Sequence, residues 1–290
     1  MKRIIAGAIA CAGVIALFAV ASASAQSIPD TLAKIKSAKQ INVAFSGDSL
    51  PFSYVDKDNK AAGYSIDICQ KVIALVSRTL GNPEIKVNWL VGTVSERLQM
   101  IASGKADLDC ANTTATQGRM QTVDFSNLVF VDSGGFIVAT ASSINKFDDM
   151  AGKKIGVIGG TTTEARVRTT MKDRQVNAQV VVVKDGNEGV AMLESGSLDA
   201  YASDKIKLVG LASQSKNPGK LVMLADDLSY EPYAFALPRG DSAFRLEVNK
   251  ALTQIFVTGA IEPIFGQWLG VLGRPTPLLS AMYLLSSVPQ

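Results

Sequence analysis

The 290-residue chain contains no histidine and only three cysteines. Without histidine it cannot form a Ser-His-Asp triad, a Cys-His pair, a 2-His-1-carboxylate iron site, or a His-ligated zinc or haem site. It also lacks the clustered basic excess that is typical of nucleic-acid binding, since 29 basic residues face 26 acidic ones. We therefore expect no metal, no cofactor and no nucleic-acid partner.

Long apolar runs are scarce, and the clearest one, Ile4–Val20, follows the basic residues Lys2 and Arg3. Small residues after it end at Ala25. A basic start, an apolar middle and an A-x-A ending predict a signal peptide over 1–25, cleaved after Ala25. The alternative is a permanent membrane anchor. The short length of the apolar run and the A-x-A sequence directly after it argue against this alternative. The mature chain, which keeps 27 basic and 26 acidic residues, is expected to be an exported, soluble monomer.

Two cysteines remain in the mature chain, Cys69 in a helical pattern and Cys110 at the end of a strand pattern. Export to an oxidising compartment permits a disulfide between them if the helix packs on the strand. Two separate small buried residues are the alternative interpretation.

Short strand patterns alternate with helical patterns along the mature chain, which is typical of α/β architecture. The expected strands are 40–45, 85–90, 106–110, 154–158, 178–184 and 198–203, and the expected helices are 65–80, 95–103 and 187–195. Residues 98–109 and 190–199 share a helix that ends in Ser-Gly and leads into a strand. This similarity predicts two α/β lobes, with small-ligand clefts at the strand ends.

The chain is expected to cross between these lobes at 136–140 and 227–235. Lobe 1 is then predicted to comprise 26–137 and 231–290, and lobe 2 to comprise 138–230.

Polar residues that suit an anion follow two of the predicted strands. Asn112–Arg119 combines hydroxyls, free backbone N–H groups and the Arg119 guanidinium, which can grip a planar carboxylate through two hydrogen bonds. Gly159–Glu164 is the second candidate, because a helix that begins at its threonines presents unpaired N–H groups. Ordinary capping turns are the alternative for both segments.

Three further residues are weak candidates when taken singly, and they indicate a site only together with these segments. Asp204 follows a strand, where it can receive an ammonium or simply cap the next helix. Arg97 lies in the first turn of its helix, which is unfavourable unless an anionic group is near. Phe52 can line a pocket or fill the core. Export, two lobes, carboxylate grips and one acid for an amine together indicate a cleft for a free amino acid.

The sequence resembles the periplasmic solute-binding proteins for polar amino acids that serve ABC transporters, family 3, and most of all their glutamate/aspartate-binding branch. The segments that carry the resemblance span nearly all of the mature chain: Pro51–Tyr54, Gly63–Asp67, Asn112–Arg119, Val123–Ser126, Gly160–Glu164, Leu193–Gly196 and Asp204. It implies the type II two-lobe fold, in which each lobe is a mixed sheet flanked by helices and the ligand cleft lies between the lobes. It also implies a periplasmic location and permease subunits as partners.

The resemblance also implies roles for single residues. Arg119, with Asn112 and the backbone around Thr114, would hold the α-carboxylate from lobe 1. Thr161 and Thr162 would contribute from lobe 2, Asp204 would receive the α-ammonium, and Arg97 would reach an acidic side chain. Ser46, in the first loop, and Gly186 stand where acidic-ligand relatives tend to carry arginine and histidine. Two groups that would contact a ligand carboxylate are thus missing, while Arg97 still favours an acidic or amide side chain. Glutamate or aspartate is the expected ligand, with glutamine, asparagine or another polar amino acid close behind.

An exported enzyme on the same scaffold, similar to a cyclohexadienyl dehydratase, is the main alternative to a binding protein. It requires a general acid in the cleft, for which Glu164 and Glu231 are the only candidate glutamates. A sensory receptor domain is the second alternative, and it would normally carry a further membrane span or cytoplasmic module. We expect a binding protein and no catalysis.

Overall fold

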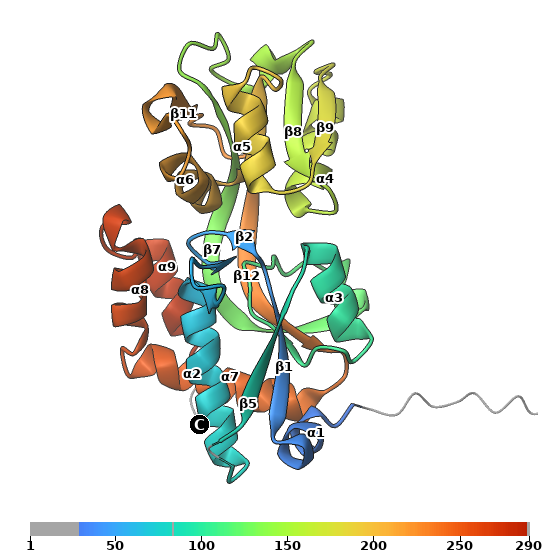
Figure 1. Ribbon diagram of the computed structural model, residues 1–290, viewed down its shortest axis with the longest axis vertical. Helices are drawn as coiled ribbons and strands as arrows, with labels where there is room; N and C mark the ends of the chain where they lie inside the picture. Colours follow the sequence, from blue (N-terminus) through green and yellow to red (C-terminus); the bar gives the residue numbers. More distant parts are fainter. Residues whose placement is uncertain (1–28, 83, 289–290) are drawn as a thin grey trace, which may run out of the picture.

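The computed structural model describes residues 29–82 and 84–288, so the predicted signal peptide lies outside the described residues. Two α/β lobes stand one above the other, and two long strands, β7 (Val123–Ala139) and β12 (Ser229–Pro238), run from one lobe into the other (Figure 1). The chain begins in the lower lobe, passes to the upper lobe through β7 and returns through β12.

The lower lobe, lobe 1, takes its elements from both ends of the chain. Its first part contains α1 (Thr31–Ala38), β1 (Gln40–Phe45), β2 (Asp48–Ser49), β3 (Ser53–Val55), β4 (Ala61–Ala62), α2 (Tyr64–Thr79), β5 (Lys86–Val91), α3 (Val94–Ala102), β6 (Leu108–Asp109) and the 3₁₀ turn η1 (Arg119–Gln121). Its second part contains α7 (Ser242–Val257), α8 (Ile261–Leu269), η4 (Gly270–Leu272) and α9 (Pro277–Leu285).

The upper lobe, lobe 2, is one continuous segment between the crossing strands. It contains η2 (Phe147–Met150), β8 (Lys154–Ile158), α4 (Thr162–Asp173), β9 (Gln179–Val183), α5 (Gly186–Glu194), β10 (Ala200–Asp204), α6 (Lys205–Ser213), η3 (Pro218–Lys220) and β11 (Leu221–Met223).

One sheet extends through both lobes in the order β5-β1-β6-β12-β7-β10-β8-β9, and β11 pairs separately with β7. The pairs β1·β5, β1·β6, β8·β9 and β8·β10 are parallel, while β12 and β7 form an antiparallel pair from Ser229↔Gly134 to Pro238↔Val123. The crossing strands are therefore each other's neighbours along their shared length. The short strands β2, β3 and β4 form a second, small sheet beside the first.

Local sequence explains two of the lobe 1 helices, α2 and α3. Helix α2 buries Ile66, Cys69, Val72 and Val76 at helical spacing, and it ends before Gly81, whose φ of +67° suits a left-handed C-terminal position. Helix α3 begins with a capping box, in which the Thr93 side chain accepts from the Glu96 N–H and the Glu96 side chain accepts from the Thr93 N–H.

Buried apolar side chains form separate clusters in the two lobes. The largest cluster joins α2, the sheet of lobe 1 and the C-terminal helices α7, α8 and α9. The last helix is docked there, because the Tyr283 hydroxyl lies 2.6 Å from that of Tyr64, which donates to the Val129 carbonyl. Among the described residues no single helix is long and apolar enough to cross a membrane; α7 and α8–η4 reach that length only together, with a bend of 79° between them.

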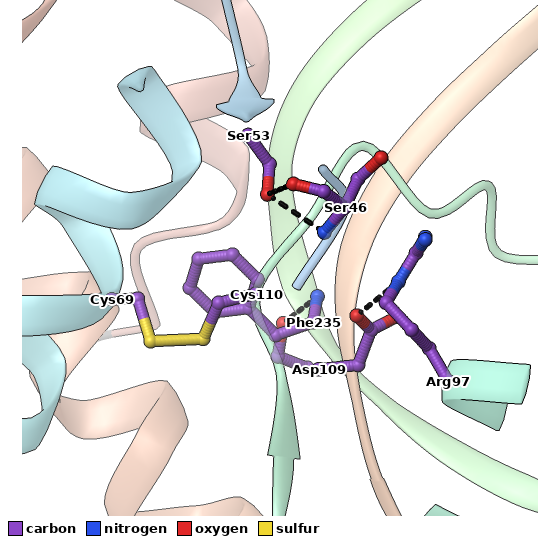
Figure 2. Close-up of a disulfide and its surroundings, with 8 residues drawn as sticks. Ser46, Ser53, Cys69, Arg97, Asp109, Cys110 and Phe235 are labelled. Atoms are coloured by element: carbon purple, nitrogen blue, oxygen red, sulfur yellow. Dashed lines mark hydrogen bonds and ion pairs between the residues drawn. A yellow bond between two sulfur atoms is a disulfide. The ribbon is translucent and has the colours of Figure 1, made fainter. Parts of the chain in front are cut away.

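The structure places Cys69 of α2 and Cys110, just after β6, in a disulfide with Cα atoms 6.0 Å apart. Figure 2 shows the bridge on one side of this strand end and the neighbouring Asp109 turned toward Arg97 on the other. Successive residues of a strand point to opposite faces, so the strand end is held from both sides. The bridge thus anchors the start of the Asn112–Arg119 loop.

Replacing both Cys69 and Cys110 by serine is expected to lower the free energy of unfolding by about 2–4 kcal/mol, because the bridge closes a long loop in the unfolded chain. Urea denaturation of the exported protein measures the change, with the reduced wild type as the matched comparison. Two reactive thiols in the untreated protein, or an unchanged urea midpoint in the variant, would contradict the bridge.

Candidate ligand-binding site

A cavity of about 500 Å³ lies between the two lobes. Its walls are the loops that follow β1, β5 and β6 in lobe 1 and the segments that follow β8, β9 and β10 in lobe 2. These are the carboxyl ends of parallel strands, which is where open α/β sheets usually bind ligands. The volume is that of a pocket for a small molecule.

Most of the predicted ligand-binding residues line this cavity: Ser46, Arg97, Asn112, Thr114, Arg119, Thr161, Thr162 and Asp204. Their roles toward a ligand stay predictions. Phe52 does not line the cavity, because its ring is fully buried and packs edge-on against Tyr64, Phe130 and Tyr233 in the lobe 1 core. The sequence-based placement of Phe52 in the pocket was therefore wrong: the aromatic cluster of the core takes the ring.

Arg119 is a cavity arginine with no carboxylate partner among the described residues. One of its terminal nitrogens donates to the Thr114 carbonyl at 2.7 Å, and among the described residues no carboxylate lies within ion-pair distance of its guanidinium. Burial, with the nearby Arg97 charge, lowers the pKa of Arg119. A half-buried guanidinium with spare N–H groups and a repelling neighbour is a favourable place for a carboxylate.

Arg97, by contrast, already has a carboxylate partner. Its Nε donates to Asp109 at 2.8 Å (Figure 2). Its terminal nitrogens donate to the Gly92 carbonyl at 2.9 Å and to the Thr113 hydroxyl at 3.0 Å. Thr113 in turn donates to Asp109 at 2.6 Å. Asp109 therefore supplies the anionic group that a positive side chain near a helix N-terminus requires, and it neutralises the charge of Arg97.

Asp204 stands at the N-cap position of α6, yet its carboxylate makes no capping hydrogen bond. It accepts instead from the Tyr233 hydroxyl at 2.6 Å, from the Asn112 amide at 3.1 Å and from the Thr163 hydroxyl at 3.3 Å. Burial and the neighbouring Glu231 charge raise the pKa of Asp204 to about 6. The carboxylate therefore does not cap its own helix, and a nearby cation would stabilise its ionised form.

Glu231, on the crossing strand β12, is an acid beside this site whose hydrogen-bond partners were not foreseen from sequence. It is 1% exposed and accepts from Thr114 at 2.5 Å, from Thr162 at 2.9 Å and from Ser229. From the sequence it was a candidate general acid without an evident partner. Thr114 and Thr162 lie in segments far from it along the chain, so no local motif signals these two contacts.

Two N–H groups of the glycine-rich turn before α4 have acceptors within the protein. Thr161 caps the helix by accepting from the Glu164 N–H at 3.1 Å, and the Gly160 N–H donates to the Glu164 carboxylate at 2.8 Å. The binding of a ligand anion at this turn stays a prediction. The Gly160 N–H, against the opposing effect of burial, lowers the pKa of Glu164, which makes this residue unsuited to act as a general acid.

Ser46 belongs to a polar group at another part of the cavity. Its hydroxyl donates to Asp48 at 3.0 Å, and Asp48 accepts from the Gly186 N–H at 2.9 Å and from Lys207 at 3.1 Å. Asp48 and Lys207 were not singled out from the sequence. Lys207 lies on α6, three residues after the N-cap residue Asp204. This spacing places the two side chains on the same side of the helix and was the signal by which Lys207 could have been found from the sequence.

Several of these contacts join the lobes directly. Asn112 to Asp204, Thr114 to Thr162 at 3.5 Å and Asp48 to Lys207 each pair a residue of lobe 1 with one of lobe 2. The lobes also approach at Gly160, where a Cβ would lie 2.5 Å from the Ser95 hydroxyl oxygen. The structure therefore has the two lobes in contact, with the cavity between them.

Comparison with known proteins matches residues 41–271 to the bacterial extracellular solute-binding proteins, family 3. An L-glutamate/L-aspartate-binding protein of Pseudomonas aeruginosa is 31% identical over 91% of this chain and 88% of its own length. A glutamate/aspartate import solute-binding protein of Salmonella typhimurium is 28% identical over 88% of this chain and 85% of its own.

Among solved structures, an ancestral arginine-binding protein bound to glutamine superimposes with a TM-score of 0.71 at 27% identity, covering 80% of this chain and 98% of that one. This similarity supports the two-lobe fold that was expected from the sequence.

Proposed function

This chain belongs to the bacterial extracellular solute-binding proteins of family 3, and we propose that it is the periplasmic binding component of an ABC importer for a polar L-amino acid. The observation that carries the proposal is the charge arrangement of the cavity: an unpaired guanidinium, Arg119, near two buried acids, Asp204 and Glu231. A free amino acid carries the complementary pair of charges on adjacent groups.

The α-groups of the ligand find partners on both lobes. Arg119 and the polar segment around Thr114 bind the α-carboxylate, while Asp204 receives the α-ammonium with Glu231 behind it. Enclosing a zwitterion has a tolerable free-energy cost when each charge is paired and hydrogen-bonded. The same arrangement disfavours molecules that lack either charge.

The side chain of the ligand is acidic in this proposal, with its amide as the alternative. The relatives that carry glutamate or aspartate in their names support this preference, and Arg97 and Lys207 both line the cavity as cations. Each of these cations has a carboxylate partner. The difference in affinity between an acidic side chain and its amide is therefore small.

The closed form, with the lobes together, is the form that the permease subunits recognise. The contacts of Asn112 and Thr114 with lobe 2 exist only when the lobes are together, and a ligand held by Arg119 and Asp204 adds to them. A ligand shifts the equilibrium toward the closed form by the difference between its affinities for the two forms. Binding and release, with no chemical conversion, are therefore the proposed activity.

Calorimetric titration of the unfolded, dialysed and refolded protein with the twenty L-amino acids tests this function. We expect heat from glutamate and aspartate, weaker or equal heat from glutamine and asparagine, and none from N-acetylglutamate, which lacks the α-ammonium. Binding of basic or aliphatic amino acids alone would contradict the proposal. Turnover of prephenate or arogenate would favour an enzyme on the same scaffold instead.

A further inference from the structure

The cavity contains a charged pair that the α-groups of an amino acid leave unused. Asp48, in the loop after β1, accepts from the Gly186 N–H at 2.9 Å and from the Lys207 ammonium at 3.1 Å. Gly186 begins α5 and Lys207 lies in the first turn of α6, so both partners belong to lobe 2. Asp48 and Lys207 both line the cavity, and the Lys207 side chain is only 6% exposed.

The Asp48 carboxylate is ionised and held in place. Ser46 donates to the other carboxylate oxygen of Asp48 at 3.0 Å. Burial alone raises the pKa of Asp48, but the Lys207 charge and the Gly186 N–H outweigh it and lower the pKa to about 2. The carboxylate is therefore charged at every pH at which the protein would bind a ligand.

Two of the cations that line the cavity, Arg97 and Lys207, each have a carboxylate partner. Asp109 balances Arg97 at 2.8 Å, and Asp48 balances Lys207 at 3.1 Å. Hydrogen-bonding capacity remains, because a lysine ammonium has three N–H donors and the described residues accept from one of them. The cavity thus offers a donor cation and an acceptor anion side by side, with no net charge.

We infer that Asp48 is a specificity-determining residue for the ligand side chain and sets the choice between a carboxylate and a carboxamide. The inference rests on the proposed function, which supplies the amino acid. A carboxamide accepts from Lys207 through its oxygen and donates to Asp48 through its nitrogen. A carboxylate accepts from Lys207 but lies beside the like charge of Asp48. The intact pair therefore keeps the affinities for glutamate and glutamine within about tenfold of each other, and loss of the Asp48 charge makes the cavity acid-selective.

The test is the ratio of dissociation constants for glutamine and glutamate, measured by calorimetry at pH 7.5 in wild type, Asp48→Asn and Lys207→Gln. Asp48→Asn is expected to shift the ratio toward glutamate by about tenfold or more, because it leaves Lys207 unbalanced. Lys207→Gln is expected to shift it toward glutamine. The ratio is used because both variants also remove a contact between the lobes, which weakens both ligands alike.

Asp58→Asn is the matched control, since Asp58 is an exposed lobe 1 acid outside the cavity and its loss changes the net charge equally. A ratio that stays at the wild-type value in both cavity variants, while the ligands still bind, overturns the inference and leaves the proposed function intact. Loss of all binding in both variants also overturns it, because the pair would then serve closure alone. Absence of amino-acid binding in the wild type overturns the proposed function and the inference together.

Discussion

Replacing Arg119 by alanine is expected to weaken binding of the amino acid by about 2–5 kcal/mol, a loss of roughly 30-fold to several thousand-fold. The guanidinium is the one cavity arginine without a carboxylate partner among the described residues, so nothing else in the protein uses its charge. Without it, the ligand carboxylate is enclosed with no cation to offset its lost hydration. Arg119→Lys keeps the charge but loses the planar guanidinium that can form two hydrogen bonds at once. Its affinity for the ligand is expected to lie between those of the wild type and Arg119→Ala.

Calorimetry with the preferred ligand measures this effect, and Arg78→Ala is the matched control because Arg78 is an exposed arginine in the last turn of α2. Equal loss in the control would indicate a general effect of net charge. Wild-type affinity in Arg119→Ala would show that the α-carboxylate binds elsewhere.

Replacing Asp204 by asparagine is expected to reduce affinity at pH 7.5 by about 30-fold or more and to remove most of its dependence on pH between 5 and 7.5. Burial, with the Glu231 charge, raises the pKa of Asp204 to about 6 in the empty protein. The ligand ammonium binds the ionised carboxylate. Affinity is therefore full above about pH 6 and falls by up to tenfold for each pH unit below it.

A neighbouring acid, Asp132, shares this environment and must be followed in the same experiment. Burial and the Asp204 charge raise the pKa of Asp132 to about 7, and the Tyr233 hydroxyl lies 3.2 Å from Asp132 and 2.6 Å from Asp204. Asp132→Asn is expected to leave the loss of affinity at acid pH where it is in the wild type, because Asp132 is already mostly protonated at the pH at which Asp204 titrates. Asp173→Asn, an exposed change on α4, controls for net charge. Equal wild-type affinity at pH 5 and pH 7.5 would contradict the role of Asp204.

Local sequence predicted β1, β5, β6, β8, β9 and β10, the helices α2, α3 and α5, and the meeting of most site residues, but not the short strands β2, β3 and β4 or the C-terminal helices α7, α8 and α9. Helix α2 follows from apolar spacing and a terminal glycine, and the cavity follows from polar residues placed after strands. Arg97 was recognised as out of place in its helix, but its partner Asp109 was not identified. That partner lies across the strand–helix packing, and nothing in the spacing of the two residues specifies the contact.

The same limit explains the residues that were missed or misplaced. Asp48 pairs with Lys207 across 159 positions of chain, and Glu231 joins Thr114 across 117. The first pair forms because the two lobes meet, and the second because β12 lies beside the loop that follows β6. The prediction for Phe52 was wrong for a simpler reason. The sequence around an aromatic loop residue is the same whether the ring lines a pocket or fills the core, and only the packing of the folded chain decides between them.

The pairing of β7 with β12 has a mechanical consequence. Because the two connections are hydrogen-bonded to each other along the shared stretch, they behave as one stiff ribbon and not as two independent tethers. A ribbon bends readily about one axis and resists sliding and twisting, so the open lobes sample few relative orientations. Little configurational entropy is then lost when they close, and more of the interaction energy with the ligand is retained as affinity.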